Sequence, residues 1–217
     1  MSSQHVDFEA ARARLVEHIS PEINDKRVLA VIARIPRELF VPPEAQHLAY
    51  ENIPLAIGLG QTISQPLIIA LMTKALELTG SEKVLEVGTG SGYQAAILAE
   101  LARSVVTTER LSPLAEAAKN VLDSLGYTNI EIHLVEETLG YQPGSPYGAI
   151  MVTAAAPRVP TSLLAQLAIG GRMVIPVGSR HVQELYKITR KRQKNIVQNL
   201  GGCRFVPLIG KDAWKKE

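Results

Sequence analysis

Three glycines alternate with other residues in the segment VLEVGTGSGYQAAILAEL, which covers residues 84–101. Gly88, Gly90 and Gly92 permit a tight turn and allow a ligand to approach the backbone closely. The apolar residues before them favour a strand, and the alanine-rich residues after them favour a helix. A turn that opens a helix directs free backbone N–H groups and the positive end of the helix dipole outward. We therefore expect a small molecule with a phosphate or a carboxylate to bind at this turn.

The spacing of the glycines argues against two common ligands. The third glycine comes one position too early for the dinucleotide motif G-x-G-x-x-G. The turn also lacks the Gly-Lys-Ser/Thr of a P-loop, so no lysine is in place for a nucleoside triphosphate. The interpretation that remains is a mononucleoside-like cofactor without a pyrophosphate.

Two acidic residues lie at positions that suit such a cofactor. Glu109 follows Gly88 by 21 residues, close to the offset of about 20 at which an acidic residue binds ribose hydroxyls. A carboxylate can accept both hydroxyl protons, and the alternative for Glu109 is an exposed charge at a strand end. Glu86 lies within the first strand, where a charge is costly unless it is paired. It either receives an ammonium group or glycine-loop N–H groups, or it faces outward as a partly solvated residue.

Residues 52–66, NIPLAIGLGQTISQP, form a long segment with little helical periodicity. Loops of this length without structure of their own are usually functional or disordered, and this one is too apolar for disorder. The polar side chains of Gln61, Thr62 and Ser64 favour a wall of the active site over a connector that packs on the core. Ser64 is also expected to cap a helix over 66–78.

Strands and helices alternate through the middle of the chain, which is typical of a doubly wound α/β sheet. Two helices are expected at the start of the chain, and Asn24 or Asp25 is expected to cap the second helix. Further helices are expected between the strands, and the last strands are expected to form an antiparallel tail. The expected helices cover 5–19, 25–34, 66–78, 113–125, 161–167 and the residues after the glycine turn. The expected strands cover 84–87, 104–109, 130–135, 147–153, 172–177, 184–189, 196–200 and 204–208.

The chain is expected to form a single domain, 1–217. A helical cap and substrate loop would occupy 1–80, a cofactor-binding core 81–180, and antiparallel C-terminal strands 181–217. In such a sheet, ligands bind beyond the carboxyl ends of the strands, where the strand order reverses. The segments expected to line one crevice are Gly88 to Tyr93, Glu109, Glu136 with Glu137, and Thr153 to Pro157.

The composition limits the kinds of partner that we expect this protein to bind. Hydrophobic residues make up 46% of the chain and charged residues 20%, as in ordinary globular domains. No apolar run approaches the roughly 18 residues of a membrane span, and the N-terminus is too charged for a secretory signal, so we expect a cytoplasmic protein without a membrane partner. A formal net charge of +2 does not require nucleic acid, and the basic run 187–195 is interpreted as a solvated hairpin. The single cysteine, Cys203, is expected to be a packing residue, with no metal site. We expect a monomer.

Several segments carry a family resemblance. VLEVGTGSGYQAAIL resembles the cofactor motif of S-adenosylmethionine-dependent methyltransferases. The further segments resemble the protein-L-isoaspartate O-methyltransferase family, and the likeness runs from residue 31 onward over nearly the whole chain. These segments are VIARIPRELFVP at 31–42, PLAIGLGQTISQP at 54–66, YGAIMVTAAAP at 147–157, GGRMVIPVG at 170–178 and CRFVPLIG at 203–210.

The resemblance implies a Rossmann-like methyltransferase sheet and a repair reaction. A methyl group would pass from S-adenosylmethionine to the free carboxylate of an L-isoaspartyl residue in a damaged protein or peptide, leaving S-adenosylhomocysteine. The methyl ester would later collapse to a succinimide. A carboxylate is already an anionic nucleophile at neutral pH, so no general base is needed, and no Ser/His/Asp constellation stands out.

The resemblance also implies roles for individual residues. Ser64 would face the substrate carboxylate as the catalytic residue. The residues expected to bind substrate are Gln61, Thr62, Ile63, Thr153, Ala154, Pro176 and Val177. Those expected to bind the cofactor are Glu86, Gly88, Thr89, Gly90, Ser91, Gly92, Tyr93, Glu109, Arg110, Glu136 and Glu137.

The chain departs from the family pattern at two places. Val135-Glu136-Glu137 stands where Gly-Asp-Gly is usual, which puts a charged side chain near the adenine edge and predicts weaker cofactor binding than is normal for the family. Ala56 stands where proline is common, which should only loosen the loop. Two other functions stay open: a methyltransferase that acts on a small acid, and a weakly active or non-catalytic homologue that binds isoaspartyl chains or S-adenosylmethionine.

Overall fold

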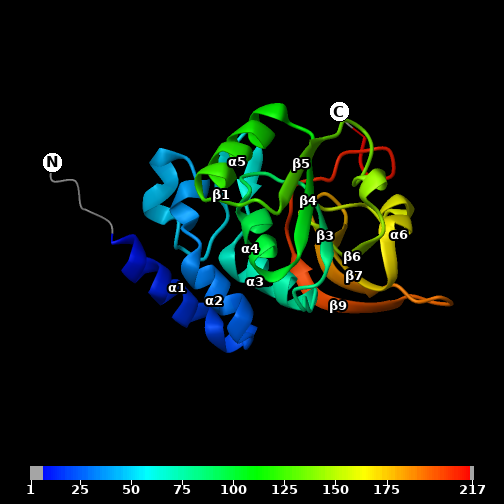
Figure 1. Ribbon diagram of the computed structural model, residues 1–217, viewed down its shortest axis with the longest axis horizontal. Coiled ribbons are helices and arrows are strands. Elements are labelled where there is room, and N and C mark those ends of the chain that lie inside the picture. The colour runs from blue at the N-terminus through cyan, green and yellow to red at the C-terminus, as the bar shows by residue number, and fades with distance from the viewer. Residues whose placement is uncertain (1–6, 216–217) are drawn as a thin grey trace.

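The computed structural model describes residues 7–215, which form a central seven-stranded sheet (Figure 1). The strand order is β5-β4-β3-β6-β7-β8-β9; the pairs from β5 to β7 are parallel, and β8 and β9 are antiparallel. This confirms the doubly wound sheet with an antiparallel extension. The strands are β3 (Lys83–Val87), β4 (Ser104–Glu109), β5 (Ile130–Leu134), β6 (Tyr147–Val152), β7 (Leu167–Gly178), β8 (Gln183–Thr189) and β9 (Ile196–Cys203).

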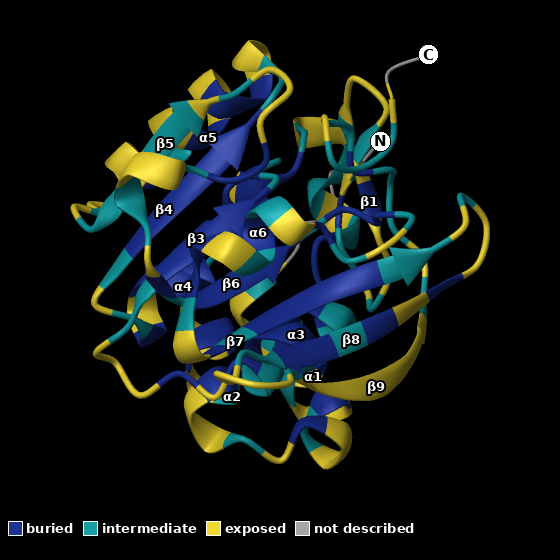
Figure 2. Cartoon of the chain, turned by 90° about the vertical axis from the view of Figure 1, so that its right-hand side faces the viewer, coloured by how far each residue is buried: buried dark blue, intermediate teal, exposed yellow. Residues whose placement is uncertain are grey.

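The central strands are buried on both faces, as Figure 2 shows for β3, β4, β6 and β7. Alternating residues point to opposite sides, so Val84 joins one hydrophobic cluster and Leu85 the other. The first cluster is formed with helices α1 to α4, and the second with α6. Parallel strands covered in this way are nearly continuously apolar, and therefore a charged residue inside β3 stands out. Four helices precede or connect the parallel strands: α3 (Pro66–Ala75), α4 (Tyr93–Leu101), α5 (Ser112–Ser124) and α6 (Thr161–Gln166).

Two helices open the described chain, α1 (Phe8–Ile23) and α2 (Lys26–Arg34). Asp25 caps α2, with its Oδ1 accepting from two backbone N–H groups at 3.0 and 3.2 Å, as the sequence predicts. The expected end of the first helix at residue 19 is wrong because α1 continues through Ser20 and Pro21 to Ile23. The Ser20 hydroxyl donates to the Glu17 carbonyl, the oxygen that the missing N–H of Pro21 leaves free. Residues 5 and 6 of the expected helix lie outside the described range.

The segment between the helical cap and α3 is not the structureless loop that the sequence suggested. After two short 3₁₀ helices, η1 (Arg37–Phe40) and η2 (Pro43–Leu48), strands β1 (Leu55–Gly58) and β2 (Gln61–Ile63) form an antiparallel hairpin. Its turn needs left-handed conformations at Gly58 and Gly60. The N-cap prediction for Ser64 is also wrong: the backbone N–H of Leu67 donates to the Asn52 side chain at 3.0 Å instead.

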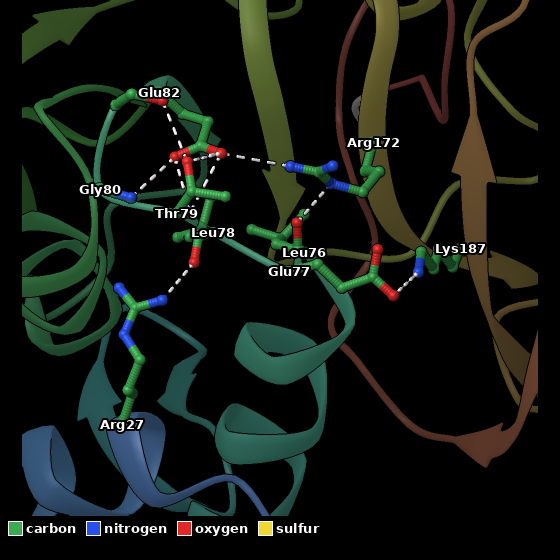
Figure 3. Close-up of polar contacts among 10 residues, drawn as sticks. Arg27, Leu76, Glu77, Leu78, Thr79, Gly80, Glu82, Arg172 and Lys187 are labelled. Atoms are coloured by element: carbon green, nitrogen blue, oxygen red, sulfur yellow. Dashed lines mark hydrogen bonds and ion pairs between the residues drawn. The ribbon is translucent and has the colours of Figure 1, made fainter.

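Helix α3 ends at Ala75, three residues before the expected end, and a connector over 76–82 leads into β3 (Figure 3). Arg27 of α2 and Arg172 of β7 donate to connector carbonyls at 2.7 and 2.5 Å. Lys187 of β8 forms an ion pair with Glu77 at 2.6 Å. This one connector thus contacts the helical cap, the parallel sheet and the antiparallel extension, which favours a single domain. The expected single domain over 1–217 stays a prediction.

The basic run 187–195 lies in the expected hairpin, because residues 190–195 join β8 to β9. The hairpin is not solvated throughout, since Lys187 is buried. The strand expected over 204–208 is wrong: there the chain makes only an isolated bridge between Pro207 and Ala155. Pro207 has no N–H to continue a ladder. Cys203 is half-buried against the core, and burial raises the pKa of its thiol to about 11. No helix within residues 7–215 is long and apolar enough to cross a membrane.

Candidate active site

A cleft of about 1180 Å³, counting its open mouth, lies beyond the carboxyl ends of the parallel strands. It is centred where β3 has β4 on one side and β6 on the other, which is the point where the strand order reverses. Its walls come from the glycine turn, the ends of β4 and β6, the β1–β2 hairpin, residues 135, 136, 138 and 139, and residues 205–209. The cleft therefore gathers segments from all three parts of the chain.

The glycine turn is held closely against the end of β6. Gly88, Gly90 and Gly92 all have positive φ, a conformation that other residues rarely adopt. A Cβ on Gly88 would collide with the hydroxyl of Thr153. A Cβ on Gly90 would stand 3.5 Å from Ile57 of β1, so the hairpin lies directly over the turn. The expected cofactor segment and the expected substrate segment are thus in contact.

Glu109 lies at the end of β4 with its carboxylate turned back toward the glycine turn. Its Oε2 accepts from the N–H of Gly90 at 2.9 Å. Its Oε1 accepts from the N–H groups of Arg110 and Leu111 at 2.7 and 3.0 Å. A carboxylate has about four acceptor positions, so about one is left for a ribose hydroxyl unless Gly90 releases its bond. The alternative of an exposed strand-end charge is wrong, since Glu109 is buried and lines the cleft.

Glu86 is fully buried, so the outward-facing, solvated alternative is wrong for this residue as well. The hydroxyl of Thr107 donates to its Oε2 at 2.5 Å, and the hydroxyls of Thr107 and Thr89 are 2.8 Å apart. Because the Thr107 proton is directed to Glu86, Thr89 must be the donor in the second bond. A chain of hydroxyls thus joins the glycine turn to the carboxyl group. Burial raises the pKa of Glu86 to about 8; Thr107 acts against this rise, and Glu109 adds to it.

The hairpin presents Ser64 and its neighbours on the other side of the cleft. Gln61, Thr62, Ile63 and Ser64 all line it. The Ser64 hydroxyl has no hydrogen-bond partner among the described residues, whereas its main-chain oxygen accepts from the buried guanidinium of Arg37 at 2.9 Å. Arg37 also donates to the carbonyl of Ala49 at 2.8 Å and lies over the Tyr93 ring. Residue 64 is therefore held by its backbone while its side chain stays available.

Thr153 and Ala154 close the cleft at the end of β6. The Thr153 hydroxyl lies 3.0 and 2.7 Å from the carbonyls of Val87 and Gly88, to which it donates. The following residue, Ala155, exchanges backbone hydrogen bonds with residues 206 and 208 at 2.8 Å. This pairing brings Phe205 to Ile209 against the cleft as a wall.

Six of the expected site residues do not line this cleft. Gly92 instead faces α5, since a Cβ there would stand 3.2 Å from Ala118. Tyr93 is buried against Phe40. Glu137 lines a neighbouring shallow hollow over residues 133–143, and its carbonyl accepts from the N–H of Lys211 at 2.8 Å. Glu86, Pro176 and Val177 are also not among the residues that line the cleft. Their roles stay predictions.

Sequence reasoning missed part of the lining, although the cleft contains thirteen of the expected residues. The missed side chains are mostly apolar, with polar exceptions in Gln94, Thr108 and Thr138. The further missed residues are Ile69, Met72, Val87, Leu111, Val135, Leu139 and the segment 205–209. Four of them lay in segments that carry the resemblance or depart from it, but none had been given a site role: Val87 and Gln94 in VLEVGTGSGYQAAIL, Val135 before Glu136, and 205–209 in CRFVPLIG. No group of three His, Cys, Asp or Glu residues suited to a metal ion occurs within residues 7–215.

An open α/β sheet with a glycine turn after its first parallel strand and a carboxylate after the second defines the class of Rossmann-like, nucleoside-binding proteins. The acceptor position left on Glu109 fits a ribose hydroxyl, as this class requires. A family model described as protein-L-isoaspartate(D-aspartate) O-methyltransferase matches residues 11–213. The chain belongs to this family, and the cofactor of the family is S-adenosylmethionine.

Individual relatives agree over nearly the full length. Protein-L-isoaspartate O-methyltransferase of Dictyoglomus thermophilum is 53% identical over 210 residues, covering 96% of both chains. The protein of the same name from Geobacter metallireducens is 49% identical over 215 residues, covering 98% of this chain and all of that one. A solved structure of a protein-L-isoaspartate O-methyltransferase is 27% identical with a TM-score of 0.84, covering 93% of this chain and 67% of its own. A second, a putative protein-L-isoaspartate O-methyltransferase from Plasmodium falciparum in complex with S-adenosyl-L-homocysteine, has a TM-score of 0.76 at 23% identity, covering 90% of this chain and 96% of its own, and supports the fold.

Proposed function

We propose that this chain methylates the free carboxylate of L-isoaspartyl residues in damaged proteins and peptides, with S-adenosylmethionine as methyl donor. The observation that carries the proposal is the contact between the glycine turn and the hairpin of Ser64 across one cleft. A cofactor held at the turn and an acceptor held at the hairpin would then meet without a further movement of the chain. Family membership supports the same reaction.

The reaction needs alignment more than acid or base chemistry. A carboxylate oxygen forms a bond to the methyl carbon while the carbon–sulfur bond breaks, and the electron pair of that bond stays on sulfur, so no proton moves. S-adenosylmethionine supplies the activated methyl group when it is bound. Opposite charges cancel in this step, so a cleft of low dielectric favours it once both partners have been placed.

The chain's own residues would divide the work between the two sides. Glu109 would hold a ribose hydroxyl. The N–H groups of Gly88, Thr89, Gly90 and Gly92 donate within the protein, so the N–H of Ser91, which has no acceptor among the described residues, would face the carboxylate end of the cofactor. The Ser64 hydroxyl would donate to one oxygen of the isoaspartyl carboxylate and leave the other free to attack. Arg37 keeps residue 64 in place through its main-chain oxygen. Thr62 and Gln61, both at the rim, would contact the substrate backbone.

A methyltransferase for a small acid and a non-catalytic binding protein remain the alternatives. Incubation with labelled S-adenosylmethionine and paired peptides that contain isoaspartate or aspartate separates the three. Base-labile methyl ester on the isoaspartyl peptide alone supports the proposal. Label on neither peptide, with S-adenosylmethionine still bound in a calorimetric titration, would favour a binding protein; label on a free dicarboxylic acid would favour the small-acid enzyme.

We also propose that the protein works in the cytoplasm as a monomer whose partners are isoaspartyl-containing proteins rather than nucleic acid or membranes. The small net charge, and a cleft with walls from all three parts of this one chain, support this. Sedimentation equilibrium at assay concentration would test it, and a dimer mass there would contradict the monomer.

A further inference from the structure

Gln94 is a polar side chain in an otherwise apolar part of the cleft. It is the second residue of α4, is 8% exposed, and lines the cleft beside Ile69 and Met72 of α3. A buried amide next to apolar side chains is costly unless its groups have partners. Packing alone therefore does not explain a glutamine at this position.

The orientation of the Gln94 amide follows from a neighbouring hydroxyl. Nε2 of Gln94 donates to Oγ1 of Thr73 at 3.1 Å. The Thr73 hydroxyl donates its only proton to the carbonyl of Ile69, one turn earlier in α3, at 2.8 Å. It can therefore only accept from Gln94, which assigns nitrogen, and not oxygen, to the side facing Thr73. The carbonyl oxygen of the amide must point the other way.

That carbonyl oxygen faces the cleft. Oε1 of Gln94 has no donor among residues 7–215, and it is not enclosed by protein as Oε1 of Glu86 is. It starts from the first turn of α4, directly after the glycine turn, and lies on the side of α3, whose first residue follows Ser64 and Gln65. The oxygen thus lies next to the glycine turn, beside the part of the cleft that Ile69 and Met72 line.

We propose that Gln94 is a specificity-determining residue that favours S-adenosylmethionine over S-adenosylhomocysteine. This inference rests on the proposed function. With the cofactor held at the glycine turn, the negative end of the amide dipole directly after that turn would face the sulfur. A sulfonium carries a positive charge and is attracted to that oxygen, whereas the thioether left after transfer is neutral. The weak dielectric screening of a buried site strengthens this difference.

The consequence is a cofactor site that binds the product, S-adenosylhomocysteine, more weakly than it binds S-adenosylmethionine. Thr73 holds the amide in one orientation before the cofactor arrives, so little rotamer entropy is lost on binding. A contact between a charged group and a well-placed amide is worth a factor of about ten in binding. We therefore expect Gln94 to account for about tenfold of the ratio between the two dissociation constants.

Calorimetric titration of both ligands into wild type, Gln94→Met and Thr73→Val tests the proposal. Methionine keeps the length of glutamine without the amide, and Gln198→Leu on the exposed strand β9 is the matched control. Gln94→Met should weaken S-adenosylmethionine by about tenfold and change S-adenosylhomocysteine by less than about twofold. Thr73→Val keeps the Gln94 amide but removes the hydroxyl that orients it, and should shift the ratio in the same direction by less. Gln198→Leu should leave it unchanged.

Equal weakening of both ligands in Gln94→Met would overturn the proposal, because the oxygen would then contact a part that the two ligands share. An unchanged ratio would overturn it too. Wild type that binds neither ligand would instead refute the proposed function. A normal thermal unfolding midpoint for each variant shows that it is folded.

Discussion

Replacing Glu86 by glutamine should remove a specific pH dependence of stability. Glu86 is fully buried, and one of its oxygens has no hydrogen-bond partner among the described residues. Burial raises the pKa of its carboxyl group from the ordinary 4.5 to about 8, so the folded protein keeps this proton at neutral pH. The unfolded chain releases it near the ordinary value. Glutamine has nearly the same shape and can still accept from Thr107, but it does not titrate.

The sign and the size of this pH dependence of stability follow from the difference in bound protons between the folded and the unfolded chain. Between about pH 4.5 and pH 8 the folded wild type binds more protons at Glu86 than the unfolded chain does, so stability is lost as the pH rises through this window. Each unit of pH inside the window costs up to about 1.4 kcal/mol, which makes a loss of about 3 kcal/mol between pH 5 and pH 8. The glutamine variant lacks this loss. Its own unpaired amide N–H₂ group adds a constant cost of about 1–3 kcal/mol.

Urea unfolding of both proteins without cofactor, followed by far-UV circular dichroism at several pH values, measures the difference. The free energy of unfolding of wild type minus that of Glu86→Gln should fall by about 3 kcal/mol from pH 5 to pH 8. Titration of other groups cancels in this difference. Curves that run parallel over the whole range would refute the reasoning, because Glu86 would then ionise in the folded protein as easily as in the unfolded one.

Three other substitutions test the cleft. Gly88→Ala places a Cβ against the Thr153 hydroxyl at a positive φ, and should weaken S-adenosylmethionine by at least about tenfold in a calorimetric titration; unchanged binding would contradict the geometry of the turn. Ser64→Ala should lower kcat/KM for an isoaspartyl peptide by about tenfold or more and leave the dissociation constant of the cofactor unchanged, because Arg37 binds a main-chain oxygen that alanine retains; full activity would exclude a role for the hydroxyl. Glu137→Gly should tighten cofactor binding by removing a charge beside the site, and an affinity equal to that of wild type would disprove the idea that Glu137 weakens it.

The parts of the site that the sequence predicted correctly depend on short stretches of chain. A strand, a glycine turn and a helix follow one another within residues 84–101, so their geometry is set locally. Glu109 ends the next parallel strand, and the fixed lengths of a strand–helix–strand unit place it beside the turn. Local spacing was therefore enough to predict that the glycine turn and Glu109 lie together, although Glu86, Gly92, Tyr93 and Glu137 do not line the cleft.

The parts that were missed depend on contacts between distant residues. Asn52 caps α3 in place of Ser64 because the hairpin brings it back over fifteen residues, which no local pattern shows. Gln94 had no visible role because its meaning comes from Thr73, on another helix. Residues 204–208 resembled a strand in composition, but Pro207 ends the ladder and forms an isolated bridge with Ala155 instead. Tertiary packing decided each of these cases.

The most direct test of the account is the fate of label from S-adenosylmethionine on two peptides that differ only in one residue, L-isoaspartate or L-aspartate. We predict a base-labile methyl ester on the isoaspartyl peptide and none on the aspartyl peptide, with labelling of the first slowed about tenfold or more when Ser64 is replaced by alanine. Equal labelling of both peptides, or of neither by a protein that binds the cofactor, would contradict the proposal that this cleft recognises and methylates isoaspartyl carboxylates.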